Sequence, residues 1–240
     1  MKIEVWSDFV CPFCYIGKRR LELALEQFPN RDQVEVEFKS FELDPNSQVF
    51  SGKNIHEAIA AKYGISLEEA KRANAGIGQQ AASVGLTFNF DDMKPTNTFD
   101  AHRLAKLAKS HGKEKELTEK LLYSYFTESK NLSDQDTLIE ITDSVGLDTE
   151  EVKSVLEDKT KFSNDVRIDE ALAQQIGVTG VPFFVINQKY SISGAQPTET
   201  FLGALQQVWQ EENPAPKLKD LSGDNSAAVC TDDSCIIPEK

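Results

Sequence analysis

The sequence predicts an α/β protein in which a small mixed β-sheet carries a large helical insertion. Near the N-terminus, two segments of alternating apolar and polar residues are joined by a helical segment, which predicts a βαβ unit. A second pair of strands, joined by a short turn, appears only near the C-terminus. Between these parts, from about Asn54 to Gly177, the apolar periodicity is almost entirely helical. So much consecutive helix cannot lie within a small sheet layer, so we expect it to pack beside the sheet.

The first strand is predicted from the alternation of Ile3 and Val5, and it leads into Trp-Ser-Asp-Phe-Val-Cys-Pro-Phe-Cys-Tyr at residues 6–15. A helix follows directly and is expected to end near Pro29–Asn30; its apolar face is Leu21, Ala24, Leu25 and Phe28. Residues 34–43 alternate again and predict a second strand. Because a helix connects the two strands, we expect them to be parallel. Residues 44–53 are predicted to form a loop.

Capping signals divide the helical block. Ser66 and Glu69 predict a capping box, Gly85 predicts a helix end, and Gly76 with Gly78 indicate a kink or a break. Residues 86–90 suit an extended segment. Four further helices are then predicted. The first follows Pro95–Thr98 and has an apolar face of Phe99, Leu104, Ala105, Leu107 and Ala108, and the second has an apolar face of Leu117, Leu121, Tyr125 and Phe126. The third runs from Ser133 to Gly146, and the fourth is capped by Asp148 and has an apolar face of Val152, Val155 and Leu156.

A short helix with Ile168, Leu172 and Ile176 is expected to stop at Gly177. Strands at 183–186 and 190–193, joined by the turn 187–189, must be antiparallel because the connection is so short. The last helix is expected from Thr198 to about Glu212, and residues 214–240 read as a flexible tail. We therefore predict a discontinuous sheet domain, an insertion and a tail, with these bounds: 1–53 with 167–213, 54–166, and 214–240.

Composition excludes several classes of protein. The chain has 240 residues, 40% of them hydrophobic, and a net charge of -13. An acidic chain with scattered basic residues does not suit nucleic-acid binding, and no apolar run approaches the roughly 20 residues of a membrane span. The N-terminus runs straight into a strand without a signal-peptide core, so we expect a cytoplasmic protein.

The four cysteines form two close pairs, Cys11 with Cys14 and Cys230 with Cys235. They are too few and too clustered for the disulfide framework of a secreted scaffold, so they indicate redox chemistry or metal binding. None of the three histidines has metal-ligand spacing to a cysteine pair. Zinc held by all four thiolates is the metal alternative.

Cys11 is predicted to lie in the first turn of a helix. Unpaired backbone N–H groups and the helix dipole favour an anion there, so its thiolate should form more readily than that of a free cysteine. Pro12 suits the same turn because a first-turn residue has no intrahelical use for an N–H. Cys14, one turn further on, can close a disulfide with Cys11.

The order of elements and three motifs together resemble a known family. The motifs are Ser-Asp-Phe-Val-Cys-Pro-Phe-Cys at 7–14, Asn97-Thr98 with Ala-His-Arg at 101–103, and Gly-Val-Thr-Gly-Val-Pro at 177–182. Up to about Glu212 the chain resembles the DsbA-like branch of the thioredoxin superfamily. Within it, the chain is most similar to FrnE-type proteins, which are related to 2-hydroxychromene-2-carboxylate isomerases and kappa-class glutathione transferases. The resemblance implies a thioredoxin fold with a helical insertion.

The resemblance also implies site residues. Pro182 should be cis and should lie next to the dithiol, which leaves the Val181 backbone free to pair with an extended substrate; a trans proline ending a loop is the alternative. The residues expected to contact substrate are Pro12, Phe13, Val181, Asn97 and His102. Asn97 or Thr98 as a helix N-cap is an equally good interpretation of that segment.

The implied chemistry is thiol-disulfide exchange. Cys11 attacks a disulfide as a thiolate, and Cys14, the more buried sulfur, resolves the mixed disulfide. Phe13 stands where strongly oxidising relatives have histidine, so we expect a less extreme potential. Many thioredoxin-fold enzymes carry a buried carboxylate where this chain has Val5, and Asp8 is the nearest substitute proton acceptor.

The expected function is a thiol-disulfide oxidoreductase acting on protein or small-molecule thiols and disulfides. Beyond its own redox-active disulfide no cofactor is expected, with glutathione as a candidate co-substrate. Cys230 and Cys235 are interpreted as an accessory pair that exchanges electrons with the Cys11–Cys14 pair. The alternative interpretation is an incidental pair of cysteines on the surface. Two alternatives remain open: a glutathione-dependent isomerase or transferase, whose members usually have serine at the position of Cys11, and a metal-binding redox sensor. A monomer or a dimer is expected.

Overall fold

The computed structural model describes residues 1–47, 52–214, 229–231 and 234–236. The chain forms two compact units, Met1–Gln206 and Gln207–Lys240. Among the described residues, no helix has both the length and the apolar character needed to cross a membrane.

The main sheet has four strands in the order β2-β1-β3-β4. Strand β1 (Lys2–Ser7) is central; it pairs in parallel with β2 (Glu35–Ser40) and antiparallel with β3 (Phe183–Ile186), which in turn pairs antiparallel with β4 (Tyr190–Ser193). The predicted βαβ unit and hairpin are thus confirmed, and they join into one sheet through β1 and β3. Strand β2 is shorter than the predicted 34–43.

Nine α-helices occur in the described residues. They are α1 (Pro12–Gln27), α2 (Ile55–Tyr63), α3 (Leu67–Ala82), α4 (Phe99–Ser110), α5 (Glu114–Phe126), α6 (Gln135–Ser144), α7 (Thr149–Glu157), α8 (Ser163–Gln175) and α9 (Thr198–Glu212), with a short 3-10 helix (Arg31–Gln33) after α1. The predicted fold class, a thioredoxin fold with a helical insertion, is confirmed.

Two local predictions are wrong. Helix α3 runs through Gly76 and Gly78 without a break, since its N-terminus is fixed by the predicted capping box and no proline interrupts it. Helix α6 is capped by the Asp134 carboxylate, which accepts the Thr137 N–H at 2.9 Å, and not by Ser133. Residues 86–90, predicted as an extended segment, form neither a helix nor a strand, and the Asn89 N–H donates to the Phe126 carbonyl.

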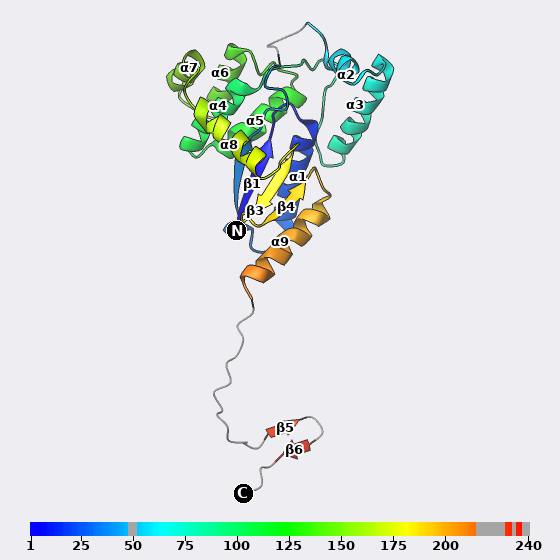
Figure 1. The fold of residues 1–240 in the computed structure, drawn as a ribbon, viewed down its shortest axis with the longest axis vertical. Coiled ribbons are helices and arrows are strands. Elements are labelled where there is room, and N and C mark those ends of the chain that lie inside the picture. The colour runs from blue at the N-terminus through cyan, green and yellow to red at the C-terminus, as the bar shows by residue number, and fades with distance from the viewer. Residues whose placement is uncertain (48–51, 215–228, 232–233, 237–240) are drawn as a thin grey trace. The chain divides into compact units, whose positions relative to one another are not determined.

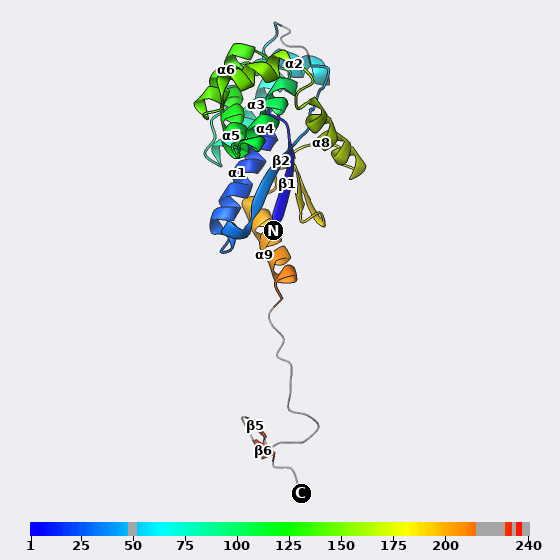
Figure 2. The same ribbon diagram turned by 90° about the vertical axis from the view of Figure 1, so that its left-hand side faces the viewer.

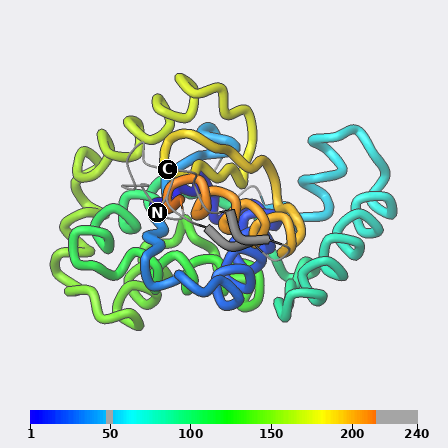
Figure 3. Tube along the Cα trace, turned by 90° about the horizontal axis from the view of Figure 1, so that it is seen from below, coloured from blue at the N-terminus to red at the C-terminus, as the bar shows by residue number. Residues whose placement is uncertain are grey.

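The helices lie on both faces of the sheet and beyond one end of it. Seen edge-on, the sheet has α1 on one side and α8 on the other (Figure 2). Helices α2 to α7 gather beyond the end of β1 from which the chain enters α1 (Figure 1). Within this block the α2–α3 pair lies to one side and α6 and α7 to the other (Figure 3). The first turn of α1 therefore lies at the junction of sheet and helical block.

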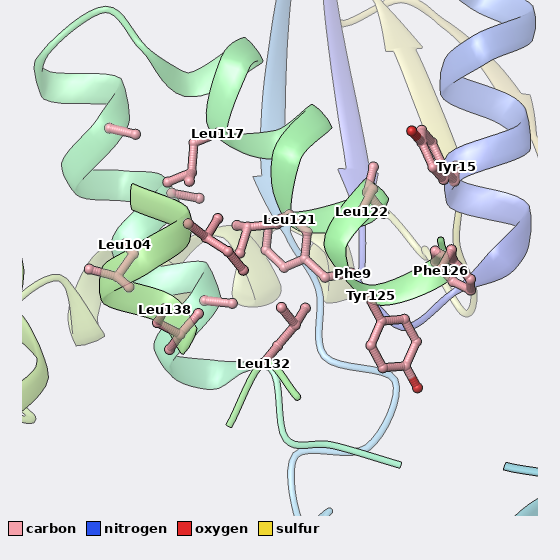
Figure 4. Close-up of a cluster of buried hydrophobic side chains, with 14 of the residues drawn as sticks. Phe9, Tyr15, Leu104, Leu117, Leu121, Leu122, Tyr125, Phe126, Leu132 and Leu138 are labelled. Carbon is pink, nitrogen blue, oxygen red and sulfur yellow. The ribbon is translucent and has the colours of Figure 1, made fainter. Parts of the chain in front are cut away.

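One hydrophobic cluster joins α1 to the helical block. Figure 4 shows the Phe9 ring beside Leu121 and Leu122 of α5, and Tyr15 of α1 on the same side as Phe126. Phe126 stacks on Phe88 with ring centroids 4.5 Å apart and lies 6.1 Å from Tyr15. Because this apolar contact is continuous, the insertion holds the helix that follows the dithiol rather than packing as a separate body.

The buried face of helix α8 is not the face that carries its large apolar residues. Ile168, Leu172 and Ile176, from which the helix was predicted, are 48%, 39% and 50% exposed. Val166, Asp169 and Ala173 are buried instead. Asp169 is buried because its carboxylate accepts the Ser40 N–H at 2.8 Å and pairs with Lys106 of α4.

Buried charges tie the helices to one another and to the sheet. Glu37 of β2 pairs with Lys2, Lys39 and Lys109. Burial raises the pKa of Glu37, but the hydrogen bonds from these ammonium groups outweigh it and hold the pKa well below its ordinary value. Arg103 of α4 is fully buried and donates to three carbonyl oxygens at and beyond the end of α7, those of Val155, Asp158 and Lys161 at 2.6, 2.9 and 3.1 Å.

The second unit contains a short antiparallel pair, β5 (Val229–Thr231) with β6 (Ser234–Ile236), in which Cys230 stands opposite Cys235 in the register. The side chains of both cysteines, and most of residues 214–240, lie outside the described residues. The predicted flexibility of this tail and the predicted domain bounds stay predictions.

Candidate active site

Cys11 is the N-cap residue of α1, and Pro12 occupies the first position of the helix. The loop that connects β1 to α1 is tight, since the Cys11 N–H donates to the Asp8 carbonyl at 3.2 Å. Cys11 keeps an extended backbone conformation, with φ -89° and ψ 112°, so its side chain lies at the start of the helix beside the unpaired N–H groups of the first turn. The predicted strand, turn and helix arrangement around the dithiol is confirmed.

The two sulfur atoms differ in acidity. The Cys14 thiol hydrogen-bonds to the Cys11 sulfur and lowers the pKa of Cys11, and the N–H groups of Cys14 and Phe13 act in the same direction. Burial and the negative charge of Asp8 oppose them without reversing the shift. Cys11 is therefore the sulfur that ionises first, as its position at a helix N-terminus predicts.

Cys14 is the more buried of the two, 2% exposed against 5% for Cys11, and both are free thiols. Burial raises the pKa of Cys14 well above its ordinary value, and the hydrogen bond to Cys11 raises it further. The Asp8 N–H donates to Cys14 Sγ at 3.5 Å, and the Ser7 hydroxyl also hydrogen-bonds to this sulfur.

The Val181–Pro182 peptide bond is cis, as the resemblance implies, and it lies against the dithiol. The Cys11 thiol donates to the Val181 carbonyl at 3.6 Å across 170 residues of sequence. Pairing of β3 with β1 produces this contact, because Phe183 directly follows Pro182 and stands opposite Trp6. Within the described part of the chain, the Val181 N–H has no hydrogen-bond acceptor.

Gly17 allows α1 to approach the cis-proline segment. A Cβ built on Gly17 would lie 3.0 Å from Pro182 Cγ, 3.3 Å from Phe184 Cζ and 3.4 Å from Ala195 Cα. The sequence offered one signal for this residue, a glycine inside a helical pattern, where it is unfavourable unless packing requires it.

The other predicted contact residues are spread around the dithiol. Phe13 is 36% exposed beside it, and Pro12 is half-buried. Asn97 is half-buried; its side chain donates to the Ser47 carbonyl at 3.1 Å and accepts the Phe99 N–H at 2.9 Å. Thr98 occupies the N-cap position of α4, but its side chain makes no capping bond. Asn97 thus serves the start of α4, and no contact joins it to the cysteines among the described residues.

His102 is buried, 2% exposed, and its Nε2 lies 3.3 Å from Asp8 Oδ1. Its ring packs on Phe9, with centroids 4.7 Å apart. Asp8 is itself only 1% exposed, and its other oxygen accepts the Leu43 N–H at 2.8 Å. The sequence predicts Asp8 as a proton acceptor and His102 as a substrate contact, but not that the two residues meet. Their contact spans 94 residues, and no local pattern reveals it.

Three or more His, Cys, Asp or Glu side chains do not cluster as metal ligands anywhere in the described ranges. Of the remaining histidines, His56 bonds to Asn74 and Asp91 and His111 pairs with Glu151. The four-thiolate zinc site would need the tail cysteines, whose side chains are outside the described residues.

Residues 2–206 match the family model described as a DSBA-like thioredoxin domain. The chain is similar to the crystal structure of the probable DsbA oxidoreductase SCO1869 from Streptomyces coelicolor, at 42% identity and a TM-score of 0.85, covering 100% of both chains. It is also similar to the uncharacterized protein YwbO of Bacillus subtilis (strain 168), at 29% identity over 204 residues. The matched segment covers 85% of this chain and 94% of YwbO. The cytosolic disulfide reductase DsbM from Pseudomonas aeruginosa, with GSH, shares the fold at 13% identity and a TM-score of 0.62, over 88% of this chain and 100% of the other.

Proposed function

The chain belongs to the DSBA-like thioredoxin domain family, and from that premise we propose that it is a thiol-disulfide oxidoreductase whose working group is the dithiol of Cys11 and Cys14. The observation that carries the proposal is the asymmetry of the two sulfur atoms. Cys11 has a lowered pKa at the start of α1 and faces the Val181 carbonyl, whereas Cys14 is buried with a raised pKa. A sulfur that ionises readily suits the first attack on a disulfide, and the protonated sulfur beside it is placed to react second.

The reaction has two exchange steps. The Cys11 thiolate attacks a substrate disulfide, forms a mixed disulfide and releases one substrate thiolate. Cys14 then loses its proton and attacks Cys11 Sγ, which closes the Cys11–Cys14 disulfide and releases the second substrate thiolate. In reverse, the oxidised pair accepts a substrate thiol. Phe13 donates no hydrogen bond to the Cys11 thiolate through its side chain, which favours a reductase or isomerase over a strong oxidase.

We assign substrate binding to the surface around the exposed Phe13 ring, together with Pro12 and Val181. The Val181 N–H without a protein acceptor suits an extended peptide that adds to the edge of the segment before β3. Glutathione is the small-molecule candidate, supported by the fold shared with DsbM, whose structure contains GSH. That relative is a cytosolic protein, and we propose the cytoplasm and the FrnE-type branch for this chain as well.

Insulin reduction with a thiol donor tests the function directly. The wild type should reduce insulin, and Cys11→Ser should abolish turnover. Cys14→Ser should instead accumulate mixed disulfides through Cys11, and sequencing the trapped partners would identify the natural substrates. A wild type that neither reduces insulin nor oxidises a dithiol peptide, and that carries stoichiometric zinc, would refute the oxidoreductase and favour the metal sensor.

The glutathione-dependent isomerase or transferase is the nearest alternative. Such an enzyme needs glutathione bound beside a single hydroxyl or thiol, and it gains nothing from a second, resolving thiol. Full isomerase activity in a Cys14→Ser variant, without insulin reduction by the wild type, would favour it.

We further propose that Cys230 and Cys235 form an accessory dithiol. Cys230 stands opposite Cys235 in the β5–β6 register, so the hairpin brings the two cysteine positions side by side. A Cys230→Ser and Cys235→Ser double variant should lower turnover with insulin and leave the single reaction of Cys11 with a small disulfide unchanged.

A further inference from the structure

The resolving step poses a chemical problem that the structure makes acute. Cys14 must lose its proton to attack the mixed disulfide, yet its sulfur is buried and its thiol form is favoured. Bulk hydroxide reaches such a sulfur poorly. A proton acceptor inside the protein would remove this barrier, and general-base assistance of this kind contributes typically about 10²- to 10⁴-fold.

Asp8 and His102 form a buried pair next to this sulfur. The main chain of Asp8 touches Cys14 through its N–H, while its carboxylate holds His102 Nε2 at 3.3 Å. Both residues are at most 2% exposed. When the imidazole gains a proton, the adjacent carboxylate compensates the new charge, so the pair can accept a proton without leaving an unpaired charge in the interior.

Ser7 contacts Cys14 and lines a small cavity together with His102. The Ser7 hydroxyl bonds to Cys14 Sγ, and Ser7 and His102 both line a small cavity of about 10 Å³, close to what one water molecule requires. The Thr118 hydroxyl lines the same cavity, is buried, and has no hydrogen-bond partner among the described residues. One cavity with room for a single water is therefore shared by His102 and by Ser7, the residue that hydrogen-bonds to the sulfur.

Other charged groups surround the pair. Lys39, Lys106 and Glu114 line the cavity from β2, α4 and α5. Burial raises the pKa of Glu42, in the loop after β2, and Arg167 and His102 oppose this shift without reversing it. Burial also raises the pKa of Tyr125, and the Asp8 charge adds to that effect. Of these groups, none but Asp8 hydrogen-bonds to the His102 ring in the described structure.

Building on the proposed oxidoreductase function, we propose that Asp8 and His102 together accept the proton of the Cys14 thiol when Cys14 resolves the mixed disulfide. The Cys14–Cys11 S–S bond forms as the Cys11–substrate S–S bond breaks, and its electron pair leaves with the substrate thiolate. The proton passes through the Ser7 hydroxyl and the cavity to His102, which Asp8 stabilises as imidazolium. The released substrate thiolate is protonated by solvent, and the imidazolium later returns its proton to solvent.

The test separates the two exchange steps by stopped-flow with 5,5′-dithiobis(2-nitrobenzoate), a symmetric disulfide that releases one coloured thiolate in each step. The first release reports attack by Cys11 and the second reports resolution by Cys14; Cys14→Ser should give one release only. In Asp8→Asn and His102→Gln, the second release should slow by about 100-fold at pH 7 and by far more than the first. Asp8→Asn also removes a charge that disfavours the Cys11 thiolate, so its first release should be at least as fast as in wild type. Asp169→Asn is the matched control, because Asp169 is also buried, accepts a backbone N–H and contacts a basic side chain.

The pH profile distinguishes a proton acceptor from a structural role. Between pH 7 and 9 the second release should change little in the wild type, but it should rise about tenfold per pH unit in both variants, because hydroxide must then remove the proton. His102→Gln keeps the Asp8 carboxylate and its hydrogen bond to the Leu43 N–H. It therefore still tests the inference if Asp8→Asn does not fold. An unchanged second release in folded variants, or equal slowing in Asp169→Asn, would overturn the inference. A wild type without any first release would overturn the oxidoreductase function itself.

Discussion

Replacing Gly17 by alanine should destabilise the protein, although the same change usually stabilises a helix. In α1 the new methyl group would meet Pro182 Cγ at 3.0 Å, Phe184 Cζ at 3.3 Å and Ala195 Cα at 3.4 Å. Two of these atoms belong to a proline ring and to backbone, which cannot rotate away. Overpacking costs about 1–3 kcal/mol, and these rigid neighbours place the cost near the upper end.

The helix propensity of alanine returns about 1 kcal/mol, so the net loss in the free energy of unfolding should be about 1–2 kcal/mol. Gly76→Ala is the matched control: it lies in the interior of α3, and a Cβ there would meet nothing within 4 Å. That variant should gain about 0.5–1 kcal/mol. The two substitutions should therefore differ by about 2 kcal/mol with opposite signs.

Urea unfolding of the two variants and the wild type measures this difference through the midpoint, provided that the slope m is unchanged. Gly17→Ala should also slow the first thiolate release, since Pro182 would be pushed away from Cys11. If Gly17→Ala raised the midpoint as much as Gly76→Ala, the close approach of α1 to the cis-proline segment would be refuted.

Three further changes have defined outcomes. Cys14→Ala should raise the pKa of Cys11, because the Cys14 thiol is the main cause of its lowering; the pH dependence of iodoacetamide alkylation would show the midpoint moving up, and a downward shift would contradict this. Glu37 has a lowered pKa in the folded state, so its stabilising effect is present above its unfolded pKa of about 4.3 and is lost as the pH falls below it; urea midpoints between pH 3 and 7 should fall less steeply in Glu37→Gln than in wild type. Arg103→Met should lower the free energy of unfolding by about 3 kcal/mol, because it removes the donor from the buried Val155 carbonyl, from the Asp158 and Lys161 carbonyls and from Asp100 Oδ1; a thermal melt within 1 °C of wild type would contradict that role.

Local chemistry made the core of the site predictable. The alternation in β1, the proline after Cys11 and the helical spacing beyond it are all short-range signals, and together they place the thiolate at a helix start. The cis bond before Pro182 and its place next to Cys11 came from the family resemblance, since no local pattern joins residues so far apart. The Asp8–His102 contact was hidden for the same reason.

Buried charge explains the main error of hydrophobic periodicity. Helix α8 was predicted from Ile168, Leu172 and Ile176, yet its inner face includes Asp169. A hydrophobic pattern predicts every charged residue to be exposed, because it contains no information about ion pairs such as that between Asp169 and Lys106. Gly17 escaped notice similarly, since its role depends on Pro182 and not on its helical neighbours.

The contact between Cys11 and Val181 has a consequence for the order of protein synthesis. The dithiol leaves the ribosome first, and its partner segment follows 170 residues later. At a synthesis rate of about 5–20 residues per second, Cys11 waits roughly ten to thirty seconds before β3 can pair with β1. During that interval the nascent chain carries two thiols near its N-terminus that Val181 and Pro182 do not yet contact. Controlled thiol exchange is therefore a property of the completed chain, and a nascent chain stalled before β3 should react with disulfides as an unfolded peptide does.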